Sequence, residues 1–134
     1  MIAAGLGCRS GSPPADIVAA VARAVAASGL CLADVHALYS AEFKAGESGL
    51  REAASALEKP LVFLPEAALT DQAAYARSRS SRVLARFALP SVAETAALAG
   101  AFELGQRRAP AQLLSARHVV GTATCALARV EALP

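Results

Sequence analysis

Short apolar runs alternate with amphipathic stretches along the first half of the chain. The runs at residues 1–6, 35–40 and 61–64 have the length and composition of buried strands. Between them, apolar residues recur at helical spacing over residues 13–28 and 48–58. A strand–helix–strand–helix–strand order predicts a parallel sheet with right-handed crossovers.

End signals support the first of these helices. Ser12 is a favourable N-cap residue, and Pro13 suits the first helical position because its missing N–H is not needed there. Gly29 follows the last residue of the amphipathic stretch, where a helix commonly ends in a left-handed residue.

The pattern is less regular in the second half. Residues 66–76 fit either one helix or two turns, and residues 81–87 fit a helix. A further helix is predicted over residues 92–102, where Ser91 and Glu94 have the spacing of a capping box. In such a box the serine hydroxyl accepts from the third helical N–H, and the glutamate accepts from the N–H of the capping residue.

The last part of the chain changes to a strand pattern. Residues 112–117 and 121–129 read as two strands, and the short link at 118–121 implies an antiparallel hairpin. The predicted fold is therefore α/β. We expect a single domain over residues 1–134, with a mixed, mostly parallel sheet flanked by helices and ending in an antiparallel C-terminal hairpin.

Composition changes this picture little. The 134 residues are 55% hydrophobic with a mean hydropathy of +0.43, but about a quarter of them are alanine. The longest apolar stretch, residues 17–27, contains Arg23 and is too short to span a bilayer. The N-terminus lacks the basic region of a secretory signal. We therefore expect a cytoplasmic protein with no membrane partner.

Charge and metal-binding residues exclude further classes. A net charge of +2, no tryptophan and few aromatic residues argue against a nucleic-acid partner. The three cysteines, Cys8, Cys31 and Cys125, form no CxxC pair, and His36 and His118 stand alone. Neither a disulfide framework nor a metal site follows, so we expect reduced thiols and no metal or cofactor.

One local cluster of arginines stands out at Arg77, Arg79, Arg82 and Arg86. Two interpretations remain open. The cluster is either a solvated loop or a basic rim for an anionic ligand.

The glycine-rich segment at residues 5–12 joins the first strand to the first helix. Such a junction presents backbone N–H groups and a partial positive charge, and Arg9 adds a guanidinium suited to a carboxylate or a phosphate. The glycine spacing is one residue too long for a dinucleotide fingerprint, and no Walker A lysine follows. Two interpretations remain open: the segment is a turn that binds no ligand, or it is an anion site. The ligand-binding residues of such a site would be Gly7, Cys8, Arg9, Ser10, Gly11 and Ser12.

A second group of polar residues follows the second strand at residues 40–50. In a parallel sheet this loop lies at the same edge as the glycine-rich segment. Lys44 offers a cation and Glu47 a general acid or base. Alternatively, these two residues pair with each other, or Glu47 complements the N-terminus of the next helix.

The motif Gly-x-Gly-Cys-Arg-x-Gly at residues 5–11 resembles the start of the CobE family and of the C-terminal domain of CbiG, the cobalt-precorrin-5A hydrolase. Arg117 replaces a lysine, and Ala88 a glycine, of the usual family pattern. Four more blocks match in order: Lys44-x-x-Glu47-x-Gly49-Leu50, Lys59-Pro60-Leu61-Val62-Phe63, Pro90-Ser91-Val92-Ala93-Glu94-x-Ala96-Ala97-Leu98 and Thr124-Cys125-Ala126-Leu127-Ala128.

The resemblance implies a role at the corrin-ring stage of cobalamin (vitamin B12) biosynthesis. The expected ligand is a precorrin or hydrogenobyrinic-type polycarboxylate, bound by an enzyme or a carrier. Lys44, Ser91 and Arg117 then join the predicted ligand-binding residues. The alternative is an accessory module that holds another enzyme of the pathway.

A catalytic version needs a general base or a nucleophile. It would resemble precorrin-5A hydrolysis, in which a lactone opens and a carbon–carbon bond is cleaved. The candidates are Glu47, Glu94 and Cys8, the last because a helix dipole and Arg9 favour a low thiol pKa.

Overall fold

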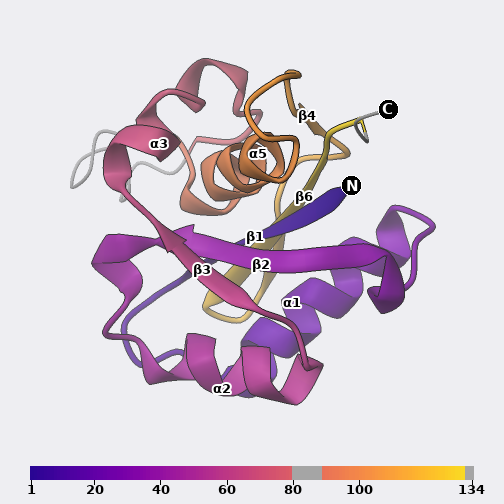
Figure 1. Ribbon diagram of the computed structural model, residues 1–134. Coiled ribbons are helices and arrows are strands. Elements are labelled where there is room, and N and C mark those ends of the chain that lie inside the picture. The colour runs from indigo at the N-terminus through magenta and orange to yellow at the C-terminus, as the bar shows by residue number, and fades with distance from the viewer. Residues whose placement is uncertain (80–88, 132–134) are drawn as a thin grey trace.

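The computed structural model of the chain describes residues 1–79 and 89–131, and a single sheet organises them (Figure 1). The strand order is β3-β2-β1-β6-β4, and β5 also pairs with β6. β1 and β2 pair in parallel, as do β2 and β3, whereas β6 is antiparallel to β1, β4 and β5. The strands are β1 Ile2–Cys8, β2 Val35–Ala41, β3 Leu61–Leu64, β4 Gln112–Leu113, β5 His118–Val120 and β6 Ala123–Arg129.

This arrangement confirms the predicted α/β fold with a mixed sheet and antiparallel C-terminal strands. The α-helices are α1 Pro14–Ala27, α2 Ser48–Leu57, α3 Glu66–Thr70 and α5 Val92–Leu104. Short 3-10 helices cover Leu32–Asp34, Glu42–Lys44 and Ala73–Tyr75. Residues 66–76 therefore form two short elements, and the helix predicted at 81–87 lies outside the described residues. In the described part of the chain, no helix has the length and apolarity needed to cross a membrane.

Ser12 does not cap α1, contrary to the prediction. The N-cap is Pro13, which makes no side-chain cap bond, while the Ser12 hydroxyl lies 2.6 Å from that of Thr122. The physical reason is Pro14, because a residue that precedes proline avoids the helical conformation. Pro13 has φ −66° and ψ 142°, so the helix begins one residue later than expected.

The C-terminal hairpin also differs from the prediction. Residues 118–121 are not a link, because β5 occupies His118–Val120 and the tight turn comes after it, with Gly121 at φ 57°. Only Gln112–Leu113 of the expected 112–117 strand pairs with β6. The strand ends early because the residues after it cross toward the N-terminus of α5, where Glu94 accepts the backbone N–H of Arg117.

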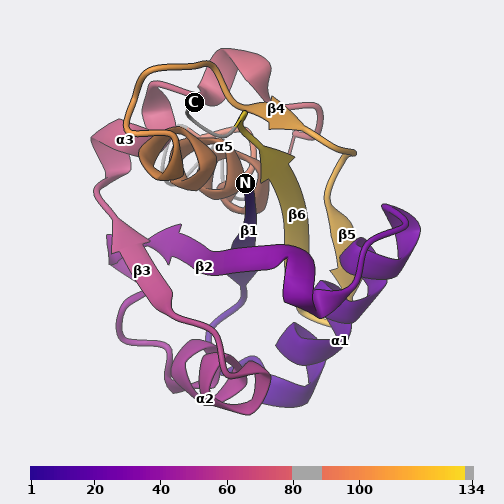
Figure 2. The ribbon, with the colours of Figure 1, turned by 45° about the vertical axis from the view of Figure 1, so that its right-hand side comes forward.

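Two apolar cores lie on opposite faces of the sheet (Figure 2). One lies under α1 and α2, and the other surrounds α5. α5 approaches β1 so closely that a Cβ on Gly5 would overlap the backbone of Ala93 and Ala97. Glycine in the strand and alanine in the helix permit this contact, which brings the N-terminal turn of α5 to the carboxyl end of β1.

Candidate functional site

The carboxyl ends of β1 and β2 meet at one edge of the sheet, as predicted. The loop at residues 9–13 follows β1, and the segment with Lys44 and Glu47 follows β2. The first residues of α5 lie beside them, since a Cβ on Gly7 would be 3.6 Å from Ala93 N. Three separate parts of the chain therefore border this edge.

Gly7 and Cys8 lie in the sheet and not in the loop that was expected to hold them. Gly7 pairs with Thr124 and Cys8 with Ala123 on β6. The strand continues through both because β6 supplies a pairing partner that the local glycine pattern does not reveal. The loop proper consists of Arg9, Ser10 and Gly11, all exposed, and the buried Ser12.

Most N–H groups of this loop are bonded within the protein. Arg9 N donates to Thr122 O, and Ser12 N donates to Arg9 O, both at 3.1 Å. Gly11 N donates to Glu47 Oε2 at 3.0 Å. The loop therefore binds a carboxylate already, from a side chain of the same molecule.

Glu47 reaches this loop from the segment before α2. It occupies the N-cap position of α2, but its side chain makes no cap bond there. Within residues 1–79 and 89–131 no ion pair links Glu47 to Lys44. The predicted ion pair with Lys44 is therefore not formed among the described residues, whereas the N-cap position of Glu47 agrees with the alternative that it complements the N-terminus of α2. Its carboxylate also joins the two loops at the edge of the sheet.

Cys8 faces this same group of residues. Burial raises the pKa of the Cys8 thiol, and the charge of Glu47 adds to the rise, while Lys44 and a bond with Ser12 act in the opposite direction. The net shift is upward, opposite to the expected one. Cys8 is therefore a neutral thiol at physiological pH, whereas a nucleophilic cysteine needs its thiolate.

The prediction of a capping box at the start of α5 is confirmed for one of its two bonds. The Ser91 hydroxyl accepts from Glu94 N at 3.3 Å, as predicted. The Glu94 carboxylate does not return to the N–H of Ser91. It accepts from three distant backbone groups: Arg77 N at 2.6 Å, Ser78 N at 2.7 Å and Arg117 N at 2.8 Å.

Glu94 is fully buried, which alone raises the pKa of its carboxyl group. The Ser78 hydroxyl and the backbone N–H groups of Ser78, Arg117 and Arg77 outweigh that effect, so the pKa lies below its ordinary value. Glu94 is thus a buried carboxylate held in its charged form by hydrogen bonds.

The predicted site residues form two neighbouring groups. Cys8, Gly11, Lys44 and Glu47 lie together at the ends of β1 and β2. Ser91, Glu94 and Arg117 gather at the first turn of α5. In the arginine cluster, Arg77 and Arg79 are exposed, while Arg82 and Arg86 lie outside the described residues.

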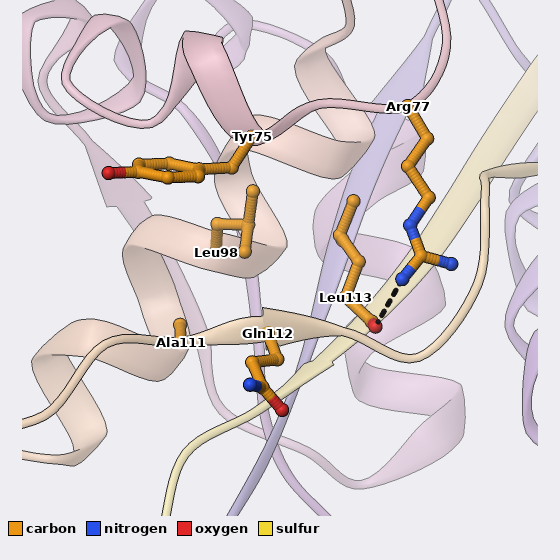
Figure 3. Close-up of a pocket in the computed structure, with 6 residues that line it drawn as sticks. All are labelled: Tyr75, Arg77, Leu98, Ala111, Gln112 and Leu113. Atoms are coloured by element: carbon orange, nitrogen blue, oxygen red, sulfur yellow. Dashed lines mark hydrogen bonds between the residues drawn. The ribbon is translucent and has the colours of Figure 1, made fainter.

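Sequence reasoning missed two features of this region. Thr122 anchors the glycine loop through its carbonyl and hydroxyl oxygens, and no local signal links it to Ser12. A pocket of about 370 Å³ lies beside α5 and β4 (Figure 3). Its walls are Tyr75, Arg77, Leu98, Ala111, Gln112 and Leu113. No motif predicts the pocket because its walls come from three separate stretches of the chain.

Comparison with known proteins gives a consistent result. The family described as "Cobalamin synthesis G C-terminus" matches residues 2–128. Protein CobE of Sinorhizobium sp is 33% identical over 97 residues, which are 72% of this chain and 63% of that protein. The chain thus spans less than two thirds of the length of this curated relative.

Solved structures share the fold. The crystal structure of CobE, a protein from the cobalamin biosynthetic pathway, is 38% identical, with a TM-score of 0.91 over 100% of this chain and 93% of that one. Cobalamin biosynthesis protein chiG from Agrobacterium tumefaciens is 35% identical, with a TM-score of 0.73 over 98% and 99% of the two chains. A putative cobalamin biosynthesis protein G homolog from Sulfolobus solfataricus, 16% identical with a TM-score of 0.65 over 97% of this chain and 37% of that one, shows the fold alone.

Proposed function

The chain belongs to the cobalamin synthesis G C-terminal family, as its motifs indicated, and we propose that it binds a polycarboxylate ring intermediate of cobalamin biosynthesis. Membership places it among cobalamin biosynthesis proteins. Precorrins and hydrogenobyrinic acid carry several acetate and propionate side chains, which guanidinium, ammonium and backbone N–H groups recognise.

The observation that carries this proposal is the bond between Gly11 N and the Glu47 carboxylate. A loop that holds a carboxylate of its own chain has the geometry to hold one from a ligand. Arg9 lies exposed in the same loop, and Lys44 lies near enough to affect the pKa of Cys8. A ligand carboxylate would replace Glu47 at Gly11 or bind next to it on these two cations.

The binding experiment measures the affinity for hydrogenobyrinic acid by calorimetry. We expect Arg9→Ala and Lys44→Ala each to weaken binding by at least several-fold. The matched control is Arg108→Ala, which removes an exposed arginine beyond the far end of α5. Equal affinities for Arg9→Ala and Arg108→Ala would contradict the site. The absence of binding to any ring intermediate at high micromolar concentration would contradict the function.

Whether the protein acts as an enzyme or a carrier is decided by the fate of the ligand. A catalytic member would open a lactone and cleave a carbon–carbon bond, as in precorrin-5A hydrolysis. Glu47 is the strongest candidate base, since Cys8 is a neutral thiol and Glu94 already accepts three backbone bonds. Incubation with a precorrin followed by mass spectrometry separates the two roles. A changed mass that Glu47→Gln abolishes indicates an enzyme, and tight binding with unchanged mass indicates a carrier.

An accessory module that holds another pathway enzyme is the second candidate. Large apolar side chains at Val62, Tyr75 and Val119 are exposed, and Tyr75 reaches 67%. Exposed aromatic residues are common anchors of protein interfaces. Co-purification with a ring methyltransferase that Val62→Ala or Val119→Ala abolishes, without loss of ligand binding, would support this candidate over the first.

A further inference from the structure

Glu94 joins two segments that are far apart in the sequence. Its Oε1 accepts from Arg77 N and Ser78 N, and its Oε2 accepts from Arg117 N. One carboxylate thus holds the segment after Ala73–Tyr75 against the segment between β4 and β5, over the first turn of α5. All three donors are backbone groups, so the side chains of both arginines remain available for other contacts.

The backbone N–H groups of the two arginines lie close together because both donate to this carboxylate. Arg77 is exposed, and Arg117 is half-buried. Together with Glu94 they leave one net positive charge at this end of α5, in addition to the partial charge of the helix N-terminus. This local charge favours an anionic group.

The guanidinium of Arg77 borders the pocket beside α5. Arg77 Nη2 donates to Leu113 O at 3.1 Å, which fixes the side chain along the pocket wall (Figure 3). A guanidinium has five N–H donors, so this bond leaves capacity for a carboxylate. Leu98 and Leu113 supply apolar wall between the Tyr75 ring and Arg77 (Figure 3). A guanidinium next to an apolar pocket suits a ligand in which a carboxylate is attached to an apolar group.

We propose that Arg77 and Arg117 form a second carboxylate subsite, which Glu94 positions and whose apolar part is the pocket of Tyr75, Leu98 and Leu113. The inference rests on the proposed function, because it assigns a second acidic side chain of the same ring ligand to this subsite. The first turn of α5 lies beside Gly7 at the edge that carries Arg9 and Lys44. The proposal therefore requires a ligand whose carboxylates are distributed around its rim.

Binding of hydrogenobyrinic acid to side-chain variants tests the subsite. Arg77→Gln and Arg117→Gln keep the backbone donors to Glu94, and circular dichroism checks that each variant is folded. We expect each to weaken binding about 3- to 10-fold and the double variant to weaken it further. The salt dependence of the affinity should fall with each arginine removed, because a screened charge contact is lost. Arg108→Gln is the control and should bind like the original chain.

To test whether Glu94 positions the arginines, the experiment must measure a quantity that does not change merely because the protein is less stable. In a double-mutant cycle, Arg77→Gln should weaken binding in the original chain but have little further effect in Glu94→Gln, at a temperature where both are folded. Full additivity would overturn the positioning role. Ser78→Ala, a milder change on the same carboxylate, gives the second measurement if Glu94→Gln does not fold.

The two proposals fail in different ways. If Arg9→Ala weakens binding while Arg77→Gln and Arg117→Gln bind like the original chain, the second subsite is overturned and the proposed function stands. If the unaltered protein does not bind the ring acid, both are overturned. A ligand whose side-chain carboxylates are converted to amides should lose the differences between the variants, and persistence of those differences would overturn carboxylate recognition.

Discussion

The helices α1 and α5 begin with the same local signal, an acidic residue at the third helical position. The two acidic side chains nevertheless differ in burial and in the hydrogen bonds that they accept. Asp16 of α1 is half-buried and accepts one long bond, from Thr122 N at 3.4 Å. Glu94 of α5 is fully buried and accepts three short bonds from other parts of the chain. Position in a helix therefore does not decide what an acid contributes. The contribution of the acid depends on how far other segments of the chain cover its helix.

The two helices also differ in how they are covered. α1 buries one stripe and leaves its other residues half-buried or exposed, while every residue of α5 from Val92 to Ala101 is buried. One side of α5 lies on β1, and α3 and the residues around β4 pack elsewhere on it. Because α5 is enclosed, changes in it should act on the whole molecule, and matched changes in α1 should stay local.

The largest expected effect is that of Glu94→Ala. It leaves three partly buried N–H groups without partners and an empty space where the buried carboxylate was, so the free energy of unfolding should fall by about 3–5 kcal/mol. Asp16→Ala should lower it by less than about 1 kcal/mol, since it loses mainly an interaction with the helix dipole. Urea denaturation of both variants at low temperature measures the difference. Equal losses would remove the contrast between the two helices.

The second largest effect is expected from a methyl group added to β1 beneath α5. Gly5→Ala places a Cβ against the backbone of Ala93 and Ala97, which cannot move aside as a side chain can, so we expect a loss of about 2–3 kcal/mol. Gly46→Ala is the control, because nothing lies within 4 Å of its added Cβ. That variant should stay within about 0.5 kcal/mol of the original chain. A stable Gly5→Ala protein would mean that α5 is free to move away from the sheet.

Acid should lower the free energy of unfolding by a smaller amount, because it protonates Glu94 and weakens its bonds to the three backbone N–H groups. The pKa of Glu94 in the folded protein lies below its ordinary value of 4.5, so its ionised form favours folding above that pH. This contribution is lost as the pH falls from about 4.5 through the lower folded pKa. Glu94→Gln should therefore show a shallower decline of unfolding free energy between pH 5 and pH 2, as followed by denaturation at each pH. Parallel declines would contradict an ionised Glu94.

The smallest expected effect concerns the cap of α5. Ser91→Ala removes the hydroxyl that accepts Glu94 N, and loss of such a cap costs about 1 kcal/mol. The variant makes this helix resemble α1, whose N-cap Pro13 makes no side-chain bond. Ser48→Ala, at an exposed position in α2, is the control and should change stability by less than about 0.5 kcal/mol. Thermal unfolding followed by circular dichroism measures both.

The contrast between α1 and α5 also marks what the sequence could predict. The stripe of α1, its end at Gly29 and the strands predicted at residues 1–6, 35–40 and 61–64 follow from short-range periodicity and end signals, although β1 continues to Cys8. The cap at Ser91 was predicted for the same reason. The start of α1 differs from the prediction for a local reason: the restriction that Pro14 imposes on Pro13 overrides the cap signal of Ser12.

The remaining differences depend on distant contacts. The donors to Glu94 are 16, 17 and 23 residues away, and Gly11 is 36 residues from Glu47. Periodicity carries no information about such pairs. The sequence could place Lys44 and Glu47 at the edge of the glycine loop, because parallel strands end together. It could not show that Glu47 binds that loop, or that a pocket lies beside α5.

The position of β6 has a consequence for how the chain is made. β6 pairs with β1 along its whole length, so Ala4 meets Leu127 across more than 120 intervening residues. At a synthesis rate of about 5–20 residues per second, on the order of ten seconds pass between the appearance of the two partners. During that interval the apolar edge of β1 is open to other chains. We therefore expect folding to be completed late in synthesis, and a nascent chain that stalls before residue 123 to be prone to aggregation.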